Sequence, residues 1–336
     1  MRGPPPPTRP AINPVQRALA VAVIGGLLAL LLFVDIGGDT AWRRVALDAA
    51  HGPIFAAVAA LIAALLPATS ARRVAGPWPD ARRYLVAFGI AVVLGAAVEA
   101  LQSLDDRPGS LFDLGTDAAG AAIGLGLLAL LERARRAPPR PAPGPTAWAL
   151  LVVALAGLAF VSWRPIEAGR AYLHRARQFP VLAAFNAPSD LYFTHTHGVS
   201  MELAALPVRW ARRPGERALR LRYEANAPPL VKVEEPFPDW RGYSALVLDL
   251  TNPTDRDLRM TLRISDAEHD WSPEDRLNLP LVLPSATRST VRVAIEAVRT
   301  APASRRADLS RIVDLALFGS GGAGEGELFV SRVWLE

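Results

Sequence analysis

Carboxylates, an amide and an arginine gather between two apolar segments, in the stretch VEALQSLDDRPGSLFDLGTD. Glu99 lies inside the end of the first segment, three residues before Gln102, and this spacing places both side chains on one helical face. Asp113 and Asp117 open the next segment, and Arg107 lies in the gap. An ionisable group in an apolar segment is costly, so it is expected to face a protein interior or water. The stretch therefore predicts a polar cluster at one end of a helical bundle.

Asp48 and His51 begin another apolar segment and are expected at the same level. Two uses of this set are open. A buried polar network would lock three helices together, with Arg107 neutralising Asp113 or Glu99. A small site open to the outer leaflet would hold a phosphate or carboxylate on Arg107 while Glu99 or His51 moves a proton. No nucleophile stands out, and one histidine with scattered carboxylates gives too few ligands for a metal site, so we expect neither metal nor cofactor.

Helix capping and close packing explain part of this stretch. Ser110 follows a turn and is placed to cap the next helix, with Asp113 as a capping-box-like partner. Gly95 lies one helical turn before the glutamate, and Gly120 and Gly124 follow the two aspartates. Small residues at this spacing let neighbouring helices approach closely. The carboxylate of the third apolar segment is the group that capping does not explain.

Five apolar segments must position these residues, each close to the roughly 17–25 residues that cross a bilayer. They lie at about 18–34, 53–67, 84–101, 114–131 and 147–163. The first is too long and lacks a convincing cleavage site for a signal peptide, so we expect it to be retained. A proline-rich, disordered cytoplasmic tail at 1–16 precedes a membrane domain at 17–163. The fold class predicted for this half is a membrane all-α bundle.

Arginines set the expected orientation. They concentrate in the tail and in the second–third and fourth–fifth loops, whereas the other loops carry offsetting aspartates. This predicts a multi-pass protein of the bacterial inner (cytoplasmic) membrane, with a cytoplasmic N-terminus and everything after Trp163 extracytoplasmic. The single lysine among many arginines indicates a GC-rich bacterial genome.

Composition excludes several other classes. The chain has no cysteine, which excludes disulfides, thiolate nucleophiles and cysteine zinc sites. Its net charge is only +5 and no basic patch interleaves with aromatic residues, so no nucleic-acid partner is expected. The lipid bilayer is the expected partner, and nothing in the sequence names a protein partner.

The order of the polar residues resembles the VanZ-like membrane proteins over residues 40–132. The residues that carry the resemblance are Asp48, His51, Glu99, Gln102, Arg107, Asp113 and Gly120. Two positions depart from the family pattern, since Ala49 stands where lysine is common and Asp117 where asparagine is common. The resemblance implies a cell-envelope context and a site, but no established reaction.

The second half of the chain has a different pattern. Residues 164–180 are expected to form a juxtamembrane linker or short helix. From 181 to 336 the hydrophobic residues alternate with polar ones, as in RALRLRYEA, LRMTLRISD and TVRVAIEA. Many short alternating strands separated by turns predict an extracytoplasmic all-β jelly-roll sandwich.

Three segments of this half, at 239–278, 293–320 and 328–336, resemble galactose-binding-like, carbohydrate-binding jelly rolls. Sugar binding needs aromatic platforms beside planar polar groups. The candidate ligand-binding residues are Trp240, Asp266, His269, Trp271, Arg276 and Asn278. Trp271 lies in a polar loop and suits a surface platform, whereas Trp240 is also compatible with a core position. Calcium binding by Asp266 with its acidic neighbours is an alternative, although the spacing is not that of an EF-hand.

These observations predict a VanZ-like membrane protein that binds or handles an envelope glycan or glycolipid without established catalysis. The alternative is a membrane enzyme that modifies a lipid-linked or cell-wall substrate with His51, Glu99, Arg107 and Asp113. A structural anchor that presents the sandwich to a protein partner is a third hypothesis. No catalytic motif is established, so the sequence leans away from an enzyme.

Overall fold

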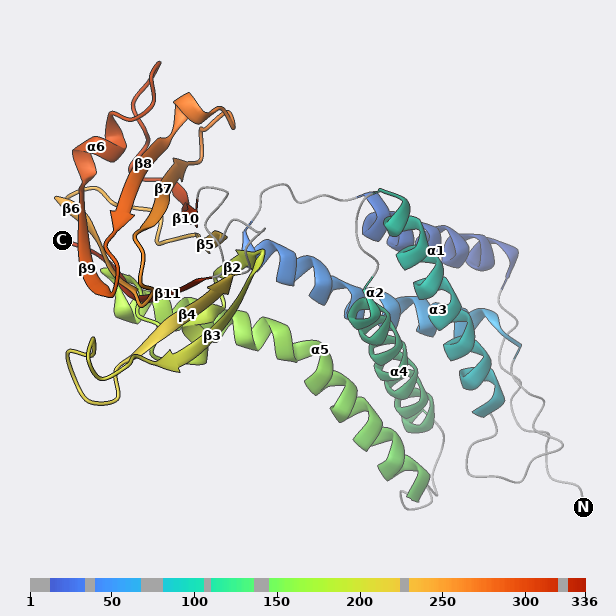
Figure 1. Cartoon of the computed structure of the whole chain (residues 1–336). Coiled ribbons are helices and arrows are strands. Elements are labelled where there is room, and N and C mark those ends of the chain that lie inside the picture. Colours follow the sequence, from blue (N-terminus) through green and yellow to red (C-terminus); the bar gives the residue numbers. More distant parts are fainter. Residues whose placement is uncertain are drawn as a thin grey trace, which may run out of the picture. The chain divides into compact units, whose positions relative to one another are not determined.

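The computed structural model describes residues 13–33, 40–67, 81–105, 110–135, 145–223, 230–319 and 326–336. The chain divides into two compact units, Met1–Glu167 and Ala168–Glu336. Helices make up the first unit, and antiparallel β-sheets dominate the second (Figure 1). The predicted order of apolar helices followed by an antiparallel β-sandwich is therefore confirmed.

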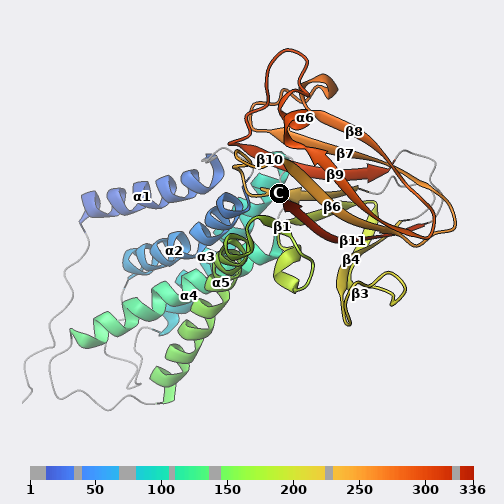
Figure 2. The same ribbon diagram turned by 90° about the vertical axis from the view of Figure 1, so that its left-hand side faces the viewer.

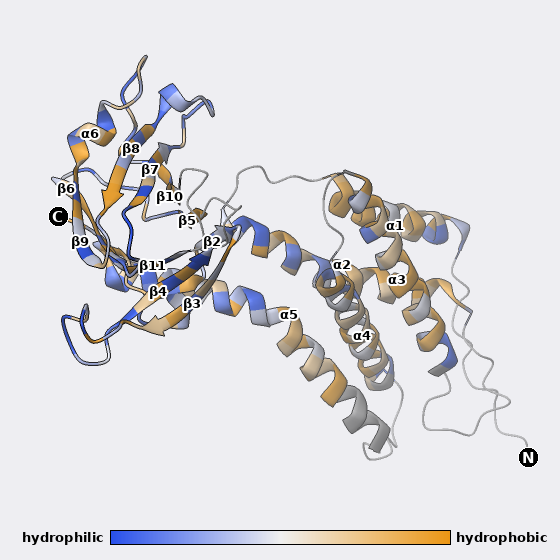
Figure 3. Cartoon of the chain, in the orientation of Figure 1, coloured by the Kyte–Doolittle hydropathy of each residue, from blue (hydrophilic) through white to orange (hydrophobic). Residues whose placement is uncertain are grey.

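Five helices carry the apolar segments. They are α1 (Pro14–Phe33), α2 (Ala41–Leu65), α3 (Ala81–Gln102), α4 (Leu111–Ala134) and α5 (Pro145–Gln178). By length and composition, all five can cross a membrane. Apolar residues predominate along them, whereas polar and apolar residues mix along the strands (Figure 3).

The first two helices begin earlier than predicted. The predicted tail at 1–16 lies outside the described residues up to position 12, but α1 already begins at Pro14. Asn13 and Gln16 form its capping box, with the Gln16 N–H donating to Asn13 Oδ1 at 2.7 Å. In α2 the Thr40 hydroxyl caps the helix, and Pro53 lies inside it. His51 is therefore an interior helical residue and does not begin the segment.

The fifth helix is longer than the fifth predicted span. It runs without a break through Pro165 to Gln178, so the segment at 164–180, predicted as a linker or short helix, is mostly helical and continues the fifth span. The proline ring removes one backbone donor, and a long helix can tolerate that loss. The boundary between the two units falls inside this helix, after Glu167.

The second unit is a sandwich of two antiparallel sheets (Figure 1 and Figure 2). One sheet has the strand order β3-β4-β11-β6-β9 with β1 paired to β11, and the other has the order β2-β5-β10-β7-β8. The strands are β1 (Val181–Ala183), β2 (Thr194–His197), β3 (Val199–Ala205), β4 (Arg217–Tyr223), β5 (Leu230–Glu234), β6 (Ala245–Asn252), β7 (Leu258–Asp266), β8 (Leu277–Leu283), β9 (Thr287–Ala294), β10 (Ile312–Gly319) and β11 (Gly326–Leu335).

The core of the sandwich follows from the alternation in the sequence. In β4 the residues Leu219 and Leu221 are buried, as are Leu262 and Ile264 in β7, and all four contribute to one hydrophobic core. Their polar neighbours point to the opposite faces of the sheets. The segment TVRVAIEA is not wholly a strand, because Ile295 begins the short helix α6 (Ile295–Arg299).

Candidate functional sites

Glycines determine where the polar residues of the helical unit meet. A Cβ atom at Gly120 would collide with the backbone carbonyl of Gly52, and one at Gly124 would collide with the carbonyl of Ala56. Helices α2 and α4 therefore approach as closely as their backbones allow, in the manner of small-residue membrane interfaces. This approach brings the residue before Gly52, which is His51, against α4.

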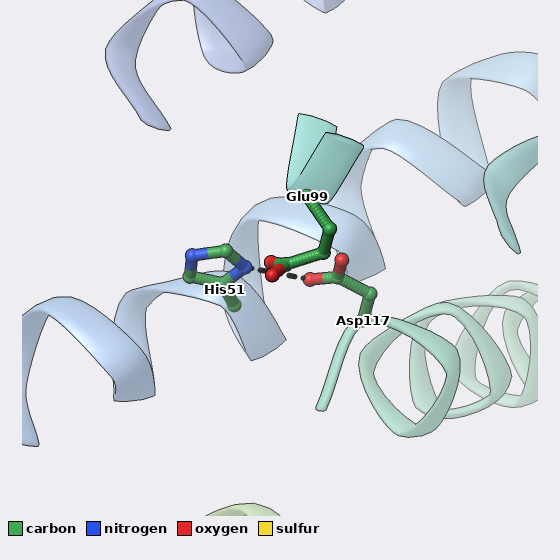
Figure 4. A group of neighbouring side chains, drawn as sticks. All are labelled: His51, Glu99 and Asp117. Atoms are coloured by element: carbon green, nitrogen blue, oxygen red, sulfur yellow. Dashed lines mark hydrogen bonds and ion pairs between the residues drawn. The ribbon is translucent and has the colours of Figure 1, made fainter. Parts of the chain in front are cut away.

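His51, Glu99 and Asp117 form a buried cluster from α2, α3 and α4 (Figure 4). His51 Nδ1 lies 2.9 Å from Asp117 Oδ1, and one ligand-type atom from each of the three residues lies within 4.8 Å of the others. The exposed fractions are 7% for His51, 9% for Glu99 and 0% for Asp117. Asp117, which departs from the VanZ-like pattern, is thus the most buried member. We name this group the α2–α3–α4 cluster.

Glu99 also caps the next helix. The Ser110 hydroxyl accepts from the Asp113 N–H at 3.3 Å, as predicted for an N-cap. The Ser110 N–H, however, donates to Glu99 Oε2 at 2.8 Å, so Glu99 takes the position expected of Asp113 in a capping box. The assignment of Asp113 as the reciprocal cap is therefore wrong.

Three carboxylate oxygens at this level are buried without a hydrogen-bond partner among the described residues. They are Glu99 Oε1, Asp113 Oδ1 and Asp117 Oδ2. A buried acceptor left unpaired costs about 1–3 kcal/mol, and a charged one costs more. Asp117 Oδ2 lies so close to Gly95 that a Cβ atom there would be 2.6 Å from it. Gly95 thus makes room for the carboxylate.

Two other predicted members of the set, Asp48 and Gln102, have partners of their own outside the cluster. Asp48 pairs with Arg164 of α5 at 2.9 Å, and that guanidinium also lies 3.6 Å from the ring centroid of Phe112. Gln102 donates to the carbonyl of Leu31 in α1 at 3.2 Å. Arg107 lies outside the described residues. Arg164 was not predicted as a member of this set, because it lies in the juxtamembrane linker or short helix expected after the fifth apolar span.

A second ion pair joins the other ends of α3 and α4. Arg83 is 4% exposed, and its Nη2 donates to both oxygens of Glu132 at 2.9 and 2.8 Å. The Tyr84 hydroxyl donates to the same carboxylate at 2.7 Å. The pair thus ties α3 to α4 at the ends opposite the α2–α3–α4 cluster.

In the sandwich, Trp271 is exposed, as predicted for a surface platform. Its exposed fraction is 72%, and its φ of 71° places the backbone in the left-handed region. The His269 ring packs against the indole with centroids 4.5 Å apart, and His269 Nε2 is buried without a partner among the described residues. We name the segment 266–278 the Trp271 loop.

Arg305 holds the Trp271 loop at two points. Its Nη1 and Nη2 donate to Asp266 at 2.6 and 2.7 Å, and its Nε donates to Asp275 at 2.7 Å. Burial would raise the pKa of Asp266, but the hydrogen bonds from Arg305 and from the Asp308 N–H outweigh it and hold that pKa below its ordinary value. Asp266 is therefore a structural anchor rather than a ligand contact. Both its oxygens are engaged, which also removes the main ligand of the calcium alternative.

The remaining predicted residues divide between core and surface. Trp240 is fully buried, and its indole N–H donates to the carbonyls of Pro236 and Phe237. It fills the core, which is the alternative that the sequence left open, and the candidate ligand-binding role of Trp240 is therefore wrong. Asn278 is exposed and donates to the Pro273 carbonyl at 2.8 Å. Arg276 is half-buried, and its Nε has no partner among the described residues.

A polar row crosses the outer face of the β2-β5-β10-β7-β8 sheet and was not predicted from the sequence. Lys232, Ala316, Arg263 and Asn278 are successive cross-strand neighbours in it. Beside the row, the 5%-exposed side chain of Asp314 lies 3.5 Å from Lys232 Nζ and 3.9 Å from Arg263 Nη2. Arg263 Nε and Asp314 Oδ1 are without partners among the described residues. Asn278 belongs both to this row and to the Trp271 loop.

An open pocket of about 510 Å³ lies elsewhere in the sandwich, beside α6. Two arginines line it, but Arg241 pairs with Asp239 at 2.7 Å and Arg299 pairs with Glu296 at 2.7 Å. Both guanidiniums of this pocket are therefore already engaged by carboxylates.

No family model matches the chain, and no curated protein matches it. Among solved structures, the chain is similar to the family 11 carbohydrate-binding module from Clostridium thermocellum in complex with a beta-1,3-1,4-mixed-linked tetrasaccharide. That match is 12% identical and covers 46% of this chain and 93% of that chain, with a TM-score of 0.35. An exo-beta-agarase matches at 12% identity over 45% of this chain and 23% of that chain, with a TM-score of 0.35.

A family 30 carbohydrate-binding module of a Clostridium thermocellum cellulosomal cellulase matches at 12% identity. The match covers 43% of this chain and 86% of that chain, with a TM-score of 0.31. The likeness concerns the β-sandwich, which the strand order above establishes by itself.

Proposed function

We propose that this chain is an integral membrane protein of the bacterial envelope whose β-sandwich binds an envelope glycan or glycolipid through the Trp271 loop. The observation that carries the proposal is the exposed indole of Trp271 on a loop that is fixed from beneath by Arg305. An aromatic platform held rigidly loses little entropy when a sugar ring stacks on it.

Polar groups beside the platform support a sugar ligand. Asn278 is exposed and links the Trp271 loop to the polar row, because it donates to the Pro273 carbonyl and is the cross-strand neighbour of Arg263. Sugar hydroxyls both donate and accept hydrogen bonds, so an amide, a guanidinium and a carboxylate suit them. A protein partner would more commonly meet a larger apolar patch around the tryptophan.

The proposal is tested on the full chain in detergent micelles, against muropeptides and lipopolysaccharide core oligosaccharides as probes. Trp271→Ala is expected to weaken binding at least tenfold, because it removes the stacking surface without touching the core. Val208→Ala, at another exposed apolar residue, is the control and is expected to bind like the parent chain. Failure of the parent chain to bind any envelope glycan, or unchanged binding by Trp271→Ala, would overturn the proposal.

We further propose that the sandwich lies on the extracytoplasmic side of the inner membrane, with the N-terminus in the cytoplasm. The arginine-rich tail and loops support this orientation. Because the chain has no cysteine, Val208→Cys creates a single labelling site. A membrane-impermeant maleimide should label it in intact spheroplasts. Labelling only after the membrane is opened would show that the sandwich lies on the cytoplasmic side and would overturn the proposed orientation.

The VanZ-like assignment of residues 40–132 also stays a proposal. Its support is that His51 and Glu99, two positions of the family pattern, meet in one buried cluster. Asp117, which departs from the pattern, occupies the same cluster. A VanZ-like protein with asparagine at the position of Asp117 would have one carboxylate fewer in this cluster. The variant Asp117→Asn therefore tests whether the function of this chain depends on having aspartate at that position.

A further inference from the structure

We propose that the α2–α3–α4 cluster binds one divalent transition-metal ion of the zinc class, with His51, Glu99 and Asp117 as its protein ligands. The inference does not rest on glycan binding, because it concerns the helical unit alone. It also revises the expectation, drawn from sequence, that one histidine with scattered carboxylates cannot make a metal site.

The spacing of the donor atoms suits a single ion. Zinc ligands bind at about 2.0–2.2 Å, so neighbouring ligands of one ion lie roughly 3 Å apart. His51 Nδ1 and Asp117 Oδ1 are 2.9 Å apart, and the Glu99 carboxylate is directed at this pair in Figure 4. The widest separation in the group is within 4.8 Å, so a small inward shift of Glu99 completes three ligands.

The unpaired oxygens are an independent indication of a ligand. Glu99 Oε1 and Asp117 Oδ2 are buried without a hydrogen-bond partner among the described residues, in side chains that are 9% and 0% exposed. The Glu99 carboxylate is nevertheless held in place by its other oxygen, because Oε2 accepts from the Ser110 N–H. A carboxylate oriented by one bond with one oxygen left over is typical of a metal ligand with its supporting contact. Asp117 offers Oδ1, which lies beside His51 Nδ1, as the neighbouring ligand atom.

Charge balance favours a cation over an empty polar cavity. Two carboxylates and one imidazole carry net negative charge when ionised, and the nearby described cation Arg164 is already paired with Asp48. Burial of such charges without compensation is expensive in a medium of low dielectric constant. A divalent ion would neutralise both carboxylates. The imidazole nitrogen indicates zinc, manganese, iron or cobalt rather than magnesium or calcium, which prefer oxygen ligands.

The rival explanation is a hydrogen-bonded network in which a proton, not an ion, lies between the groups. The metal site and the hydrogen-bonded network predict different numbers of bound ions per chain and different Co²⁺ spectra. The full chain is purified through a histidine-free affinity tag, stripped with chelator, and titrated with Zn²⁺ and separately with Co²⁺. The proposal expects one ion per chain at micromolar metal, together with a visible Co²⁺ absorption band that reports nitrogen and oxygen ligands. No ion bound at micromolar metal would overturn it.

Matched variants locate the ion. Glu99→Gln and Asp117→Asn keep side-chain size, and each is expected to weaken Zn²⁺ binding by about tenfold or more. The double variant His195→Gln/His197→Gln removes the two exposed histidines of β2 and is expected to keep the ion. Retention by Glu99→Gln and Asp117→Asn, or loss in the β2 double variant, would refute the assignment. Should a cluster variant fail to fold, X-ray absorption at the zinc edge of the parent chain decides, since a site of one imidazole and oxygen ligands is required.

Discussion

Removal of the Arg305 guanidinium should detach the Trp271 loop from the sandwich. Arg305 donates to Asp266 in β7 and to Asp275 in the loop, so it ties the loop at both ends. Arg305→Met keeps most of the aliphatic stem and removes the five donors. The variant therefore separates the charge contribution from packing.

The burial of Asp266 and Arg305 sets the expected loss of stability in Arg305→Met. The side chain of Asp266 is 1% exposed and that of Arg305 is 22% exposed. Loss of one partner of a buried ion pair costs about 3–5 kcal/mol because the other charge is left without compensation. Water reaches part of Arg305, so we expect a decrease of about 2–4 kcal/mol in the free energy of unfolding of the sandwich. Domains of this kind are stable by only about 5–15 kcal/mol, so the change is readily measured.

The lowered pKa of Asp266 determines how the effect of Arg305→Met on stability changes with pH. The folded-state pKa of Asp266 is lowered, so its contribution is fully present above its unfolded pKa of about 3.9 and is lost as the pH falls through the folded pKa. The difference between the parent chain and Arg305→Met should therefore be full at pH 7. It should shrink below about pH 4, where the carboxylate becomes protonated first in the unfolded chain and, at lower pH, in the folded chain.

Urea pulse proteolysis of the full chain in detergent measures the stability of the sandwich at each pH. Arg241→Met is the matched control, because its partner Asp239 is at the surface, where such pairs contribute little. We expect no measurable change for the control. An Arg305→Met variant as stable as the parent chain at pH 7, or a difference that grows toward pH 3, would refute the reasoning.

Three further changes test the packing. Gly120→Ala places a Cβ against a backbone carbonyl of α2 and should lower the thermal midpoint of the helical unit by an amount equivalent to about 1–3 kcal/mol, whereas Gly126→Ala, whose Cβ meets open space, should not. Trp240→Ala should cost about 3–5 kcal/mol and render the sandwich protease-sensitive, because it empties a fully buried position. Arg164→Met should cost at most about 1 kcal/mol by the same thermal assay, since the side chains of Arg164 and Asp48 are 40% and 32% exposed; a larger loss would show that the pair is shielded from water.

Local patterns determined much of the fold. The apolar segments are long enough to fix five helices, and a period of two fixes strands such as β4 and β7, because each pattern records which side chains must leave water. The Ser110 cap was predictable for the same reason, since a cap depends on neighbours within one turn. Helix bounds were less well determined. Pro53 suggested a helix start, but α2 begins at Ala41 and contains the proline.

The composition of the site required the tertiary structure. The sequence grouped seven polar residues at one level, yet contact between α2 and α4 at Gly120 decides that His51 meets Asp117 while Asp48 pairs with Arg164. Likewise, Arg305 anchors a loop about forty residues earlier, and no local spacing indicates this. Sequence periodicity encodes which residues are buried, whereas the partner of each buried charge depends on how closely separate elements can pack.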